Sequence, residues 1–106
     1  MKYLKDIAAV IRSKNSGPYE LTFDVIFTNS IQFNRFCREK VLNNHTFAEL
    51  YGIPENQVLS IIEFPPALAV KVTIIRPISS GALGDRDIYG AQQHAPLMGL
   101  PLNGWE

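Results

Sequence analysis

The sequence contains a single cysteine, Cys37, so no internal disulfide can form. Ten basic residues balance ten acidic ones, and the chain therefore lacks the basic excess typical of nucleic-acid-binding proteins and of polybasic membrane anchors. No apolar run approaches the roughly 20 residues of a membrane-spanning helix. The first residues lack the apolar core and cleavage site of a signal peptide. These absences predict a cytoplasmic protein with neither nucleic acid nor membrane as a partner.

The residues that are present have an ordinary globular composition, with 46% hydrophobic and 19% charged side chains. A chain of 106 residues is long enough for one modest hydrophobic core and too short for two. We therefore expect a single domain over residues 1–106.

Three segments have strand patterns. Residues 20–27 alternate apolar and polar side chains, and residues 57–64 and 68–76 are rich in β-branched residues. Residues 3–12 fit a helical stripe and a strand about equally. The turn-forming residues 13–18 predict a break after them.

Two segments have helix patterns. Apolar residues spaced three and four apart predict an amphipathic helix over Ser30–Val41, with N-cap chemistry at residues 28–30. Thr46 and Glu49 form a capping-box pattern, which predicts a second helix through Tyr51 that stops at Gly52. The pair Pro65-Pro66 predicts a wide connection between the last two strands, since neither proline has an N–H to donate.

Most aromatic residues are interpreted as core. All six phenylalanines fall in predicted strands or helices, where aromatic side chains usually fill a sheet–helix interface. Cys37 lies on the apolar side of the first helix, where an inert, buried thiol is expected. Trp105 ends an apolar tail, which either docks on another surface or folds back on its own domain.

The segment from Ile78 to Leu97 is polar, without amphipathic period and rich in chemically active side chains. Asp85, Asp87 and His94 are its candidate catalytic set, because a carboxylate can orient a histidine that titrates near neutral pH. Tyr89 and Gln93 could add hydrogen bonds to a polar substrate. The alternative is that the two aspartates hold loop turns and His94 packs or caps.

A second candidate site lies near the predicted turn. Arg12, Lys14, Asn15 and Gly17 bring cations and hydrogen-bond donors together, and a glycine turn can aim backbone N–H groups at a carboxylate or phosphate. The alternative is a solvated turn with two exposed cations. No metal-ligand spacing and no cofactor motif is present, so we expect neither metal nor cofactor.

Three stretches together resemble a small family of unknown function that accompanies the AtuA-like (acyclic terpene utilisation) proteins. They are Val10–Thr22, Pro66–Lys71 and Gly84–Pro96. The pattern Arg-Ser-x-x-x-Gly from Arg12 is also similar to the ferredoxin-like C-terminal domain of the AtuA-like proteins themselves. There the loop usually reads Arg-Ser-Gly-Asp-Lys-Gly. Here Lys14, Asn15 and Ser16 replace its middle, so an acidic role cannot be carried over.

The resemblance implies that residues 3–12 form a strand paired with residues 20–27. The expected fold is α+β: about four strands in an antiparallel or mixed sheet, helices on one face, a ferredoxin-like arrangement and a long irregular C-terminal segment. The strand–strand–helix order departs from the usual ferredoxin-like order.

Three functions are consistent with this sequence, and the weakest is a self-sufficient enzyme, because so small a chain leaves little room for a closed, water-free site. The first is a small accessory subunit of an AtuA-like enzyme that hydrates, dehydrates or isomerises small carboxylic acids or their thioesters. Its site would be shared with the larger subunit, and the early basic turn and the late Asp/His segment would enclose one hollow. The second is a non-catalytic ligand-binding or assembly module that forms a homo-oligomer.

Overall fold

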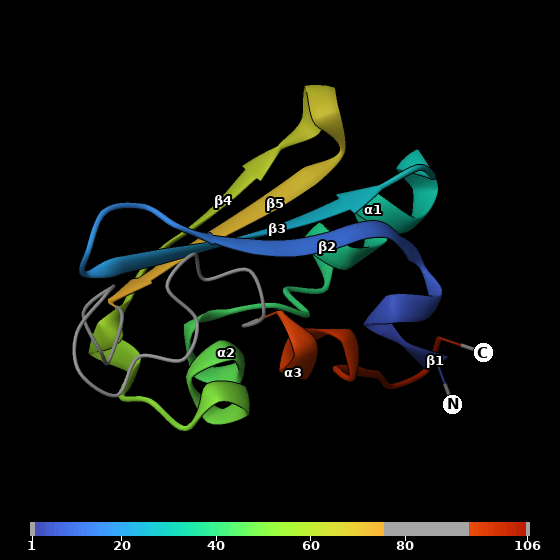
Figure 1. Ribbon diagram of the computed structural model, residues 1–106. Coiled ribbons are helices and arrows are strands. Elements are labelled where there is room, and N and C mark those ends of the chain that lie inside the picture. The colour runs from blue at the N-terminus through green and yellow to red at the C-terminus, as the bar shows by residue number, and fades with distance from the viewer. Residues whose placement is uncertain (1, 76–93, 106) are drawn as a thin grey trace.

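The computed structural model describes residues 2–75 and 94–105. Their main feature is a four-stranded antiparallel sheet in the order β2-β3-β5-β4 (Figure 1). Its strands are β2 (Ala8–Asn15), β3 (Glu20–Phe27), β4 (Val58–Phe64) and β5 (Ala69–Ile75). The expectation of an antiparallel or mixed four-stranded sheet is thereby resolved as antiparallel.

The helices follow β3 along the chain. They are α1 (Ser30–Arg38) and α2 (Asn44–Tyr51), and a third short helix, α3 (Ala95–Met98), lies near the C-terminus. Figure 1 shows α2 and α3 on the same side of the sheet. From β2 to β5 the strands and α-helices run strand–strand–helix–helix–strand–strand, so the ferredoxin-like order is not confirmed.

The core lies between the sheet and this helical layer. Phe23 and Phe27 on β3 project to the same face because strand side chains alternate. The Phe23 ring lies 5.0 Å from Phe47 of α2, and the Phe27 ring lies 5.1 Å from Phe36 of α1, centroid to centroid. One strand therefore anchors both helices through two aromatic side chains.

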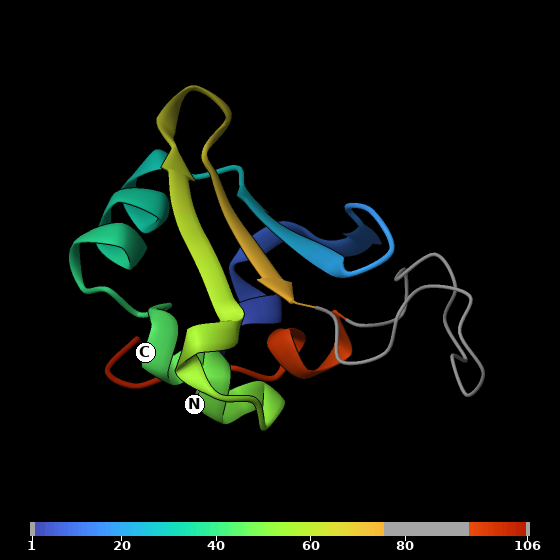
Figure 2. The same ribbon diagram turned by 90° about the vertical axis from the view of Figure 1, so that its left-hand side faces the viewer.

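The two ends of the described chain lie close together in both views (Figure 1 and Figure 2). Strand β1 (Lys2–Tyr3) pairs antiparallel with β6 (Pro101–Leu102), and the Leu4 N–H donates to the Leu100 carbonyl at 2.8 Å. A 3-10 turn, η1 (Leu4–Asp6), then leads into β2. The resemblance implied a strand over residues 3–12; this is confirmed from Ala8 onward, whereas Leu4–Asp6 form a 3-10 turn.

Several boundaries differ from the sequence predictions. Strand β2 continues to Asn15, beyond the predicted break at residue 13, because its residues pair with β3 as far as Asn15 opposite Leu21. Helix α1 ends at Arg38 and not at Val41, because Lys40 adopts a positive φ of 52°. At its other end Asn29 caps α1 as expected, and its side chain accepts bonds from two backbone N–H groups.

The capping box predicted for the second helix is also wrong. Asn43 is the N-cap of α2, and its side chain accepts a bond from the Thr46 N–H at 2.9 Å. Thr46 therefore lies inside the helix. The stop at Gly52 is confirmed, and its φ of 65° is a left-handed conformation that glycine adopts without strain.

The two proline residues form the predicted wide connection. A 3-10 turn, η3 (Pro65–Ala67), joins β4 to β5 and ends at Leu68 with a φ of 51°. A second such turn, η2 (Glu55–Gln57), precedes β4.

Phe64 overturns the expectation that every phenylalanine is core. Its side chain is 56% exposed at the end of β4, whereas the other five are buried. The sequence pattern could not predict this exposure, because edge strands and central strands have a similar alternation of apolar and polar residues.

Candidate functional site

Among the described residues, α1, α2 and α3 lie on one side of the sheet, and the opposite face has exposed side chains on its edge strands, although Thr22 on its central strand β3 is buried. Register places Arg12, Asp24 and Lys71 in one row across β2, β3 and β5. Because buried Phe23 and Val25 on β3 face the helices, Asp24 between them faces the other way. We call this surface the open face.

A charged cluster occupies the middle of the open face. The Arg12 Nε lies 3.1 Å from the Asp24 carboxylate, and Lys71 is the cross-strand neighbour of Asp24 on its other side. Lys14 follows Arg12 by two residues on β2 and so lies on the same face. Among the described residues, neither Lys14 nor Lys71 forms an ion pair, which leaves two cations for an acidic partner or ligand.

An apolar region adjoins this cluster. Register aligns Val10, Ile26, Ala69 and Phe64 in the next row across the four strands. Val10 is 40% exposed, and Ile62 of β4, in the charged row, is 54% exposed. The open face therefore combines apolar contact area with cations.

Asn15 and Gly17 do not join Arg12 and Lys14. Asn15 lies opposite Leu21, so its side chain points to the helical side of the sheet. Gly17 lies in the exposed turn between β2 and β3 with a φ of 94°, which requires glycine or strain. The four residues of the predicted anion site therefore do not lie together. Residues 12–15 belong to one strand, so Arg12 and Lys14 lie on one face of the sheet and Asn15 on the other.

His94 lies on the helical side as well. It is the N-cap residue of α3, and its carbonyl accepts a bond from the Leu97 N–H at 3.0 Å. Helix α3 packs against α2 and η1, away from the open face. The remaining predicted site residues, Asp85, Asp87, Tyr89 and Gln93, lie outside the described residues.

The sheet therefore separates Arg12 and Lys14 from His94 within one chain. The predicted single hollow that joins the basic turn to His94 is not formed by these three side chains. The prediction treated residues 12–17 as one loop, whereas Arg12 and Lys14 project from a regular strand.

An aromatic cluster on α2 and β3 contacts α3 through Tyr51. Tyr51 stacks on Phe47 with ring centroids 4.5 Å apart and lies 5.1 Å from Phe23. Burial raises the pKa of Tyr51, and a hydrogen bond with the backbone of Leu97 acts against this rise. Tyr51 thus remains a neutral phenol and is suited to hydrogen bonding rather than to acid–base work near neutral pH.

Cys37 lies on the apolar side of α1 as predicted, but it is half-buried rather than fully buried. Cys37 packs against the core on the inner side of α1. Burial, followed by the nearby Glu63 carboxylate, raises the pKa of its thiol to about 11. Such a thiol carries little thiolate at neutral pH and is a poor nucleophile.

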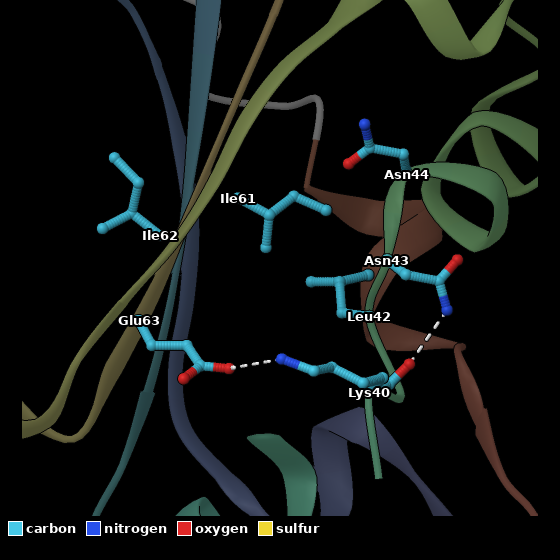
Figure 3. A pocket seen from close by; sticks show the side chains of 7 residues that line it. All are labelled: Lys40, Leu42, Asn43, Asn44, Ile61, Ile62 and Glu63. Carbon is cyan, nitrogen blue, oxygen red and sulfur yellow. Dashed lines mark hydrogen bonds and ion pairs between the residues drawn. The ribbon is translucent and has the colours of Figure 1, made fainter. Parts of the chain in front are cut away.

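A hollow of about 560 Å³ lies beside β4 (Figure 3). Its lining combines three β4 residues with the connection from α1 to α2: Lys40, Leu42, Asn43, Asn44, Ile61, Ile62 and Glu63. In the close view Ile61 points toward Leu42, whereas Ile62 points to the other side of the strand. Lys40 Nζ lies 3.9 Å from the Glu63 carboxylate at one end.

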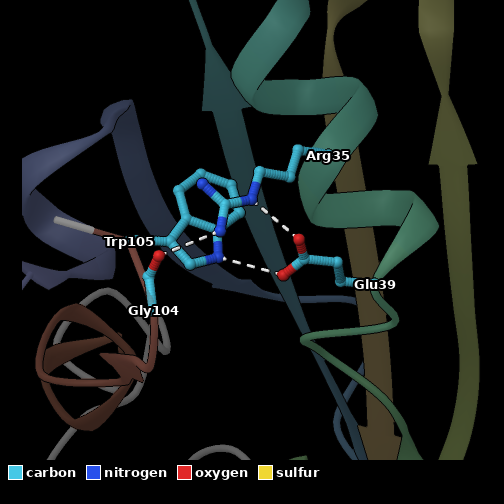
Figure 4. A network of polar contacts seen from close by, with 4 residues as sticks. All are labelled: Arg35, Glu39, Gly104 and Trp105. Atoms are coloured by element: carbon cyan, nitrogen blue, oxygen red, sulfur yellow. Dashed lines mark hydrogen bonds and ion pairs between the residues drawn. The ribbon is translucent and has the colours of Figure 1, made fainter.

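The C-terminal tail folds back on its own domain, which decides between the two alternatives left by the sequence. Trp105 is 4% exposed, and its indole N–H donates to Glu39 Oε1 at 3.1 Å. Arg35 lies 4.2 Å from the indole ring centre, donates to the other Glu39 oxygen at 2.7 Å and reaches the Gly104 carbonyl (Figure 4). Sequence reasoning missed this network, although Arg35 and Glu39 have the i,i+4 spacing of helical ion pairs.

The described residues offer no group of three metal ligands. His45 contacts Glu49 and Glu55, but its two ring nitrogens point to different carboxylates, at 3.2 and 3.4 Å. One ion cannot be held by both nitrogens of one ring. Within the same ranges, no helix is long and apolar enough to cross a membrane.

The described residues define an α+β protein with a four-stranded antiparallel sheet that carries its helices on one side. Residues 4–101 match the model of the family described as domain of unknown function (DUF4387), and the chain belongs to this family. No curated protein and no solved structure matches it significantly.

Proposed function

We propose that this protein is a small accessory subunit that binds a larger AtuA-like metabolic enzyme through its open face. The enzyme would act on small carboxylic acids or their thioesters by hydration, dehydration or isomerisation. The resemblance of residues 10–22, 66–71 and 84–96 to the family that accompanies AtuA-like proteins supports this partner. The open face supports a docking role independently of that resemblance.

The single observation that carries the docking role is the uncovered apolar area on a central sheet. Val10 and Phe64 lie at the two ends of one row and are 40% and 56% exposed. Water contact with such apolar area is unfavourable, and exposed apolar groups bordered by polar ones are typical of protein-binding surfaces. A larger subunit would remove this area from water.

The charges of the open face indicate the chemistry of the partner. Asp24 is paired with Arg12, while Lys14 and Lys71 carry positive charge toward solvent within the described part of the chain. A partner surface with apolar side chains and one or two carboxylates would complement this arrangement. A carboxylate substrate held between the two proteins would meet the same cations.

Asp85, Asp87 and His94 remain the candidates for proton transfer in this proposal, with Tyr89 and Gln93 as substrate contacts. They stay candidates because of their chemistry. Since His94 and Arg12 lie on opposite sides of the sheet, His94 and the docking cations would serve different parts of the complex.

The proposal is tested with a purified AtuA-like protein and this chain, mixed and passed through a sizing column. We expect a stable complex and turnover of a short-chain thioester only in the mixture. Lys71→Glu should weaken complex formation about tenfold or more, because it turns a complementary charge into a like charge. Lys5→Glu, at an exposed position on η1, is the matched control. Failure of the unaltered chain to bind contradicts the proposal.

A homo-oligomeric assembly module is the second candidate function. It is favoured by a different observation: within residues 2–75 and 94–105, the outer edge of β4 pairs with no other strand.

A further inference from the structure

Strand β4 is one of the two edges of the sheet. It pairs with β5 on one side, and no other backbone group in residues 2–75 and 94–105 bonds to it across its outer side. An unpaired strand edge presents N–H and C=O groups that can accept another strand.

The two edges of the sheet differ in how they resist such pairing. Edge strand β2 carries the exposed cations Arg12 and Lys14, and charged side chains discourage the approach of another strand. Strand β4 carries one charged residue, Glu63, which already lies near Lys40. A register shift can also protect a strand edge from pairing, but in β4 the shift lies at the start of the strand, between Val58 and Ser60.

The side chains of β4 also favour contact with another strand. Leu59, Ile62 and Phe64 are 46%, 54% and 56% exposed, so nearly half of this seven-residue strand consists of large apolar residues in contact with water. Apolar, β-branched and aromatic residues opposite one another stabilise neighbouring strands by about 0.2–1 kcal/mol per pair.

We propose that β4 pairs antiparallel with β4 of a second copy of this chain, about a two-fold axis at Ile61. The two sheets would then form one continuous eight-stranded sheet. The two strands of an antiparallel pair are related by a two-fold axis. The same strand of each copy can therefore form the whole contact.

The charges fit this register. With Ile61 opposite Ile61 of the second copy, Ser60 lies opposite Ile62. Glu63 then lies opposite Leu59, and the two Glu63 carboxylates do not face each other. Because the chain has ten charges of each sign, the two copies carry no net charge that would keep them apart.

The hollow beside β4 has room for the second strand's side chains. Ile61 and Leu42 line it from two sides (Figure 3). A strand added at this edge sends alternate side chains to the same side as Ile61. In the proposed register the second copy's Ile61 has that orientation, and an apolar side chain enters an apolar part of the hollow.

The interface is small. Seven residues at about 3.3 Å per residue give a contact roughly 23 Å long, which corresponds to the low end of specific protein interfaces. We therefore expect a dimer that dissociates on dilution. Edge pairing leaves the open face of each copy uncovered, so this inference does not depend on the proposed function.

Cross-linking tests the register. In a Cys37→Ser background, Ile61→Cys places two thiols on the two-fold axis, where facing residues have Cα atoms about 4.5–5.5 Å apart and a disulfide can form. We expect rapid dimer formation under mild oxidation. The control, Leu59→Cys in the same background, should not cross-link, because the two positions are offset by about 13 Å along the strand. Cross-linking of the control in preference to Ile61→Cys overturns the register.

Sedimentation of the unaltered chain tests the dimer itself and does not depend on the folding of the Ile61 variant. We expect a concentration-dependent monomer–dimer equilibrium. Ile62→Lys puts cations beside the axis at an exposed position and should weaken dimerisation at least tenfold, whereas Val10→Lys on the other edge strand should leave it unchanged. A monomer at every concentration, or a dimer equally weakened by Val10→Lys, overturns the proposal.

Discussion

The indole N–H of Trp105 donates a hydrogen bond of 3.1 Å to the carboxylate of Glu39, 66 residues earlier in the chain. The same carboxylate accepts from Arg35, which also lies over the indole ring. These contacts fasten the end of the chain to α1 (Figure 4).

Acidification should loosen this attachment. The hydrogen bond from Arg35 is the largest cause that lowers the pKa of Glu39, so the carboxylate is favoured in the folded state. Its stabilising effect is complete above the ordinary glutamate pKa of about 4.3 and is lost as the pH falls through the lower folded value. Trp105 fluorescence should report the change. Glu39→Gln should remove this pH dependence, and an unchanged acid transition in that variant would contradict the assignment.

The aromatic anchors predict unequal costs for two phenylalanine substitutions. Phe23→Ala should reduce the free energy of unfolding by about 3–5 kcal/mol, because it leaves a cavity against Phe47 and Tyr51. Phe64→Ala at the exposed end of β4 should change monomer stability by about 0.5 kcal/mol or less. Urea unfolding of both variants provides the comparison. Similar losses at the two positions would show that Phe64 is buried in solution.

The N-cap of α2 is testable in the same way. Asn43→Ala should cost about 1 kcal/mol, because the Thr46 N–H loses its acceptor. Thr46→Ala should cost only a few tenths of a kcal/mol, since Thr46 lies within the helix. Thermal unfolding measures both effects, and the reverse order would restore the capping box that the sequence suggested.

Cys37 should react slowly with thiol reagents. With its pKa raised from 9.0 to about 11, the thiolate fraction near neutral pH falls roughly a hundredfold relative to an ordinary thiol. The rate of iodoacetamide labelling in the folded protein, compared with the rate in denaturant, measures this. Equal rates in the two states would show that the thiol is exposed and unperturbed.

Arg12 and His94 should act independently, since the sheet lies between them. The Arg12–Asp24 pair is exposed on the Arg12 side, so Arg12→Ala should cost less than about 1 kcal/mol. The double variant with His94→Ala should show the sum of the two single effects within about 0.5 kcal/mol. A larger coupling energy in unfolding measurements would mean that the two residues share a site after all.

The sequence by itself determined the local elements. Alternation predicted β3, three- and four-residue spacing predicted α1, Gly52 marked the end of α2, and Pro65-Pro66 predicted a wide connection before β5. These features depend on backbone preferences and on neighbours within a few residues, which a sequence shows directly. The residues alone left segment 3–12 open between a helix and a strand, and it was the resemblance that implied the strand found from Ala8 onward.

Only the tertiary structure decided which of these residues meet. Pairing with β3 kept residues 12–15 in one strand, so alternation put Arg12 and Asn15 on opposite faces, and the place of each strand in the sheet left Phe64 exposed and Phe23 buried. Packing brought Trp105 to Glu39, 66 residues away along the chain. Such outcomes depend on contacts between residues far apart in the chain, and these contacts are set by how the sheet and helices exclude water together.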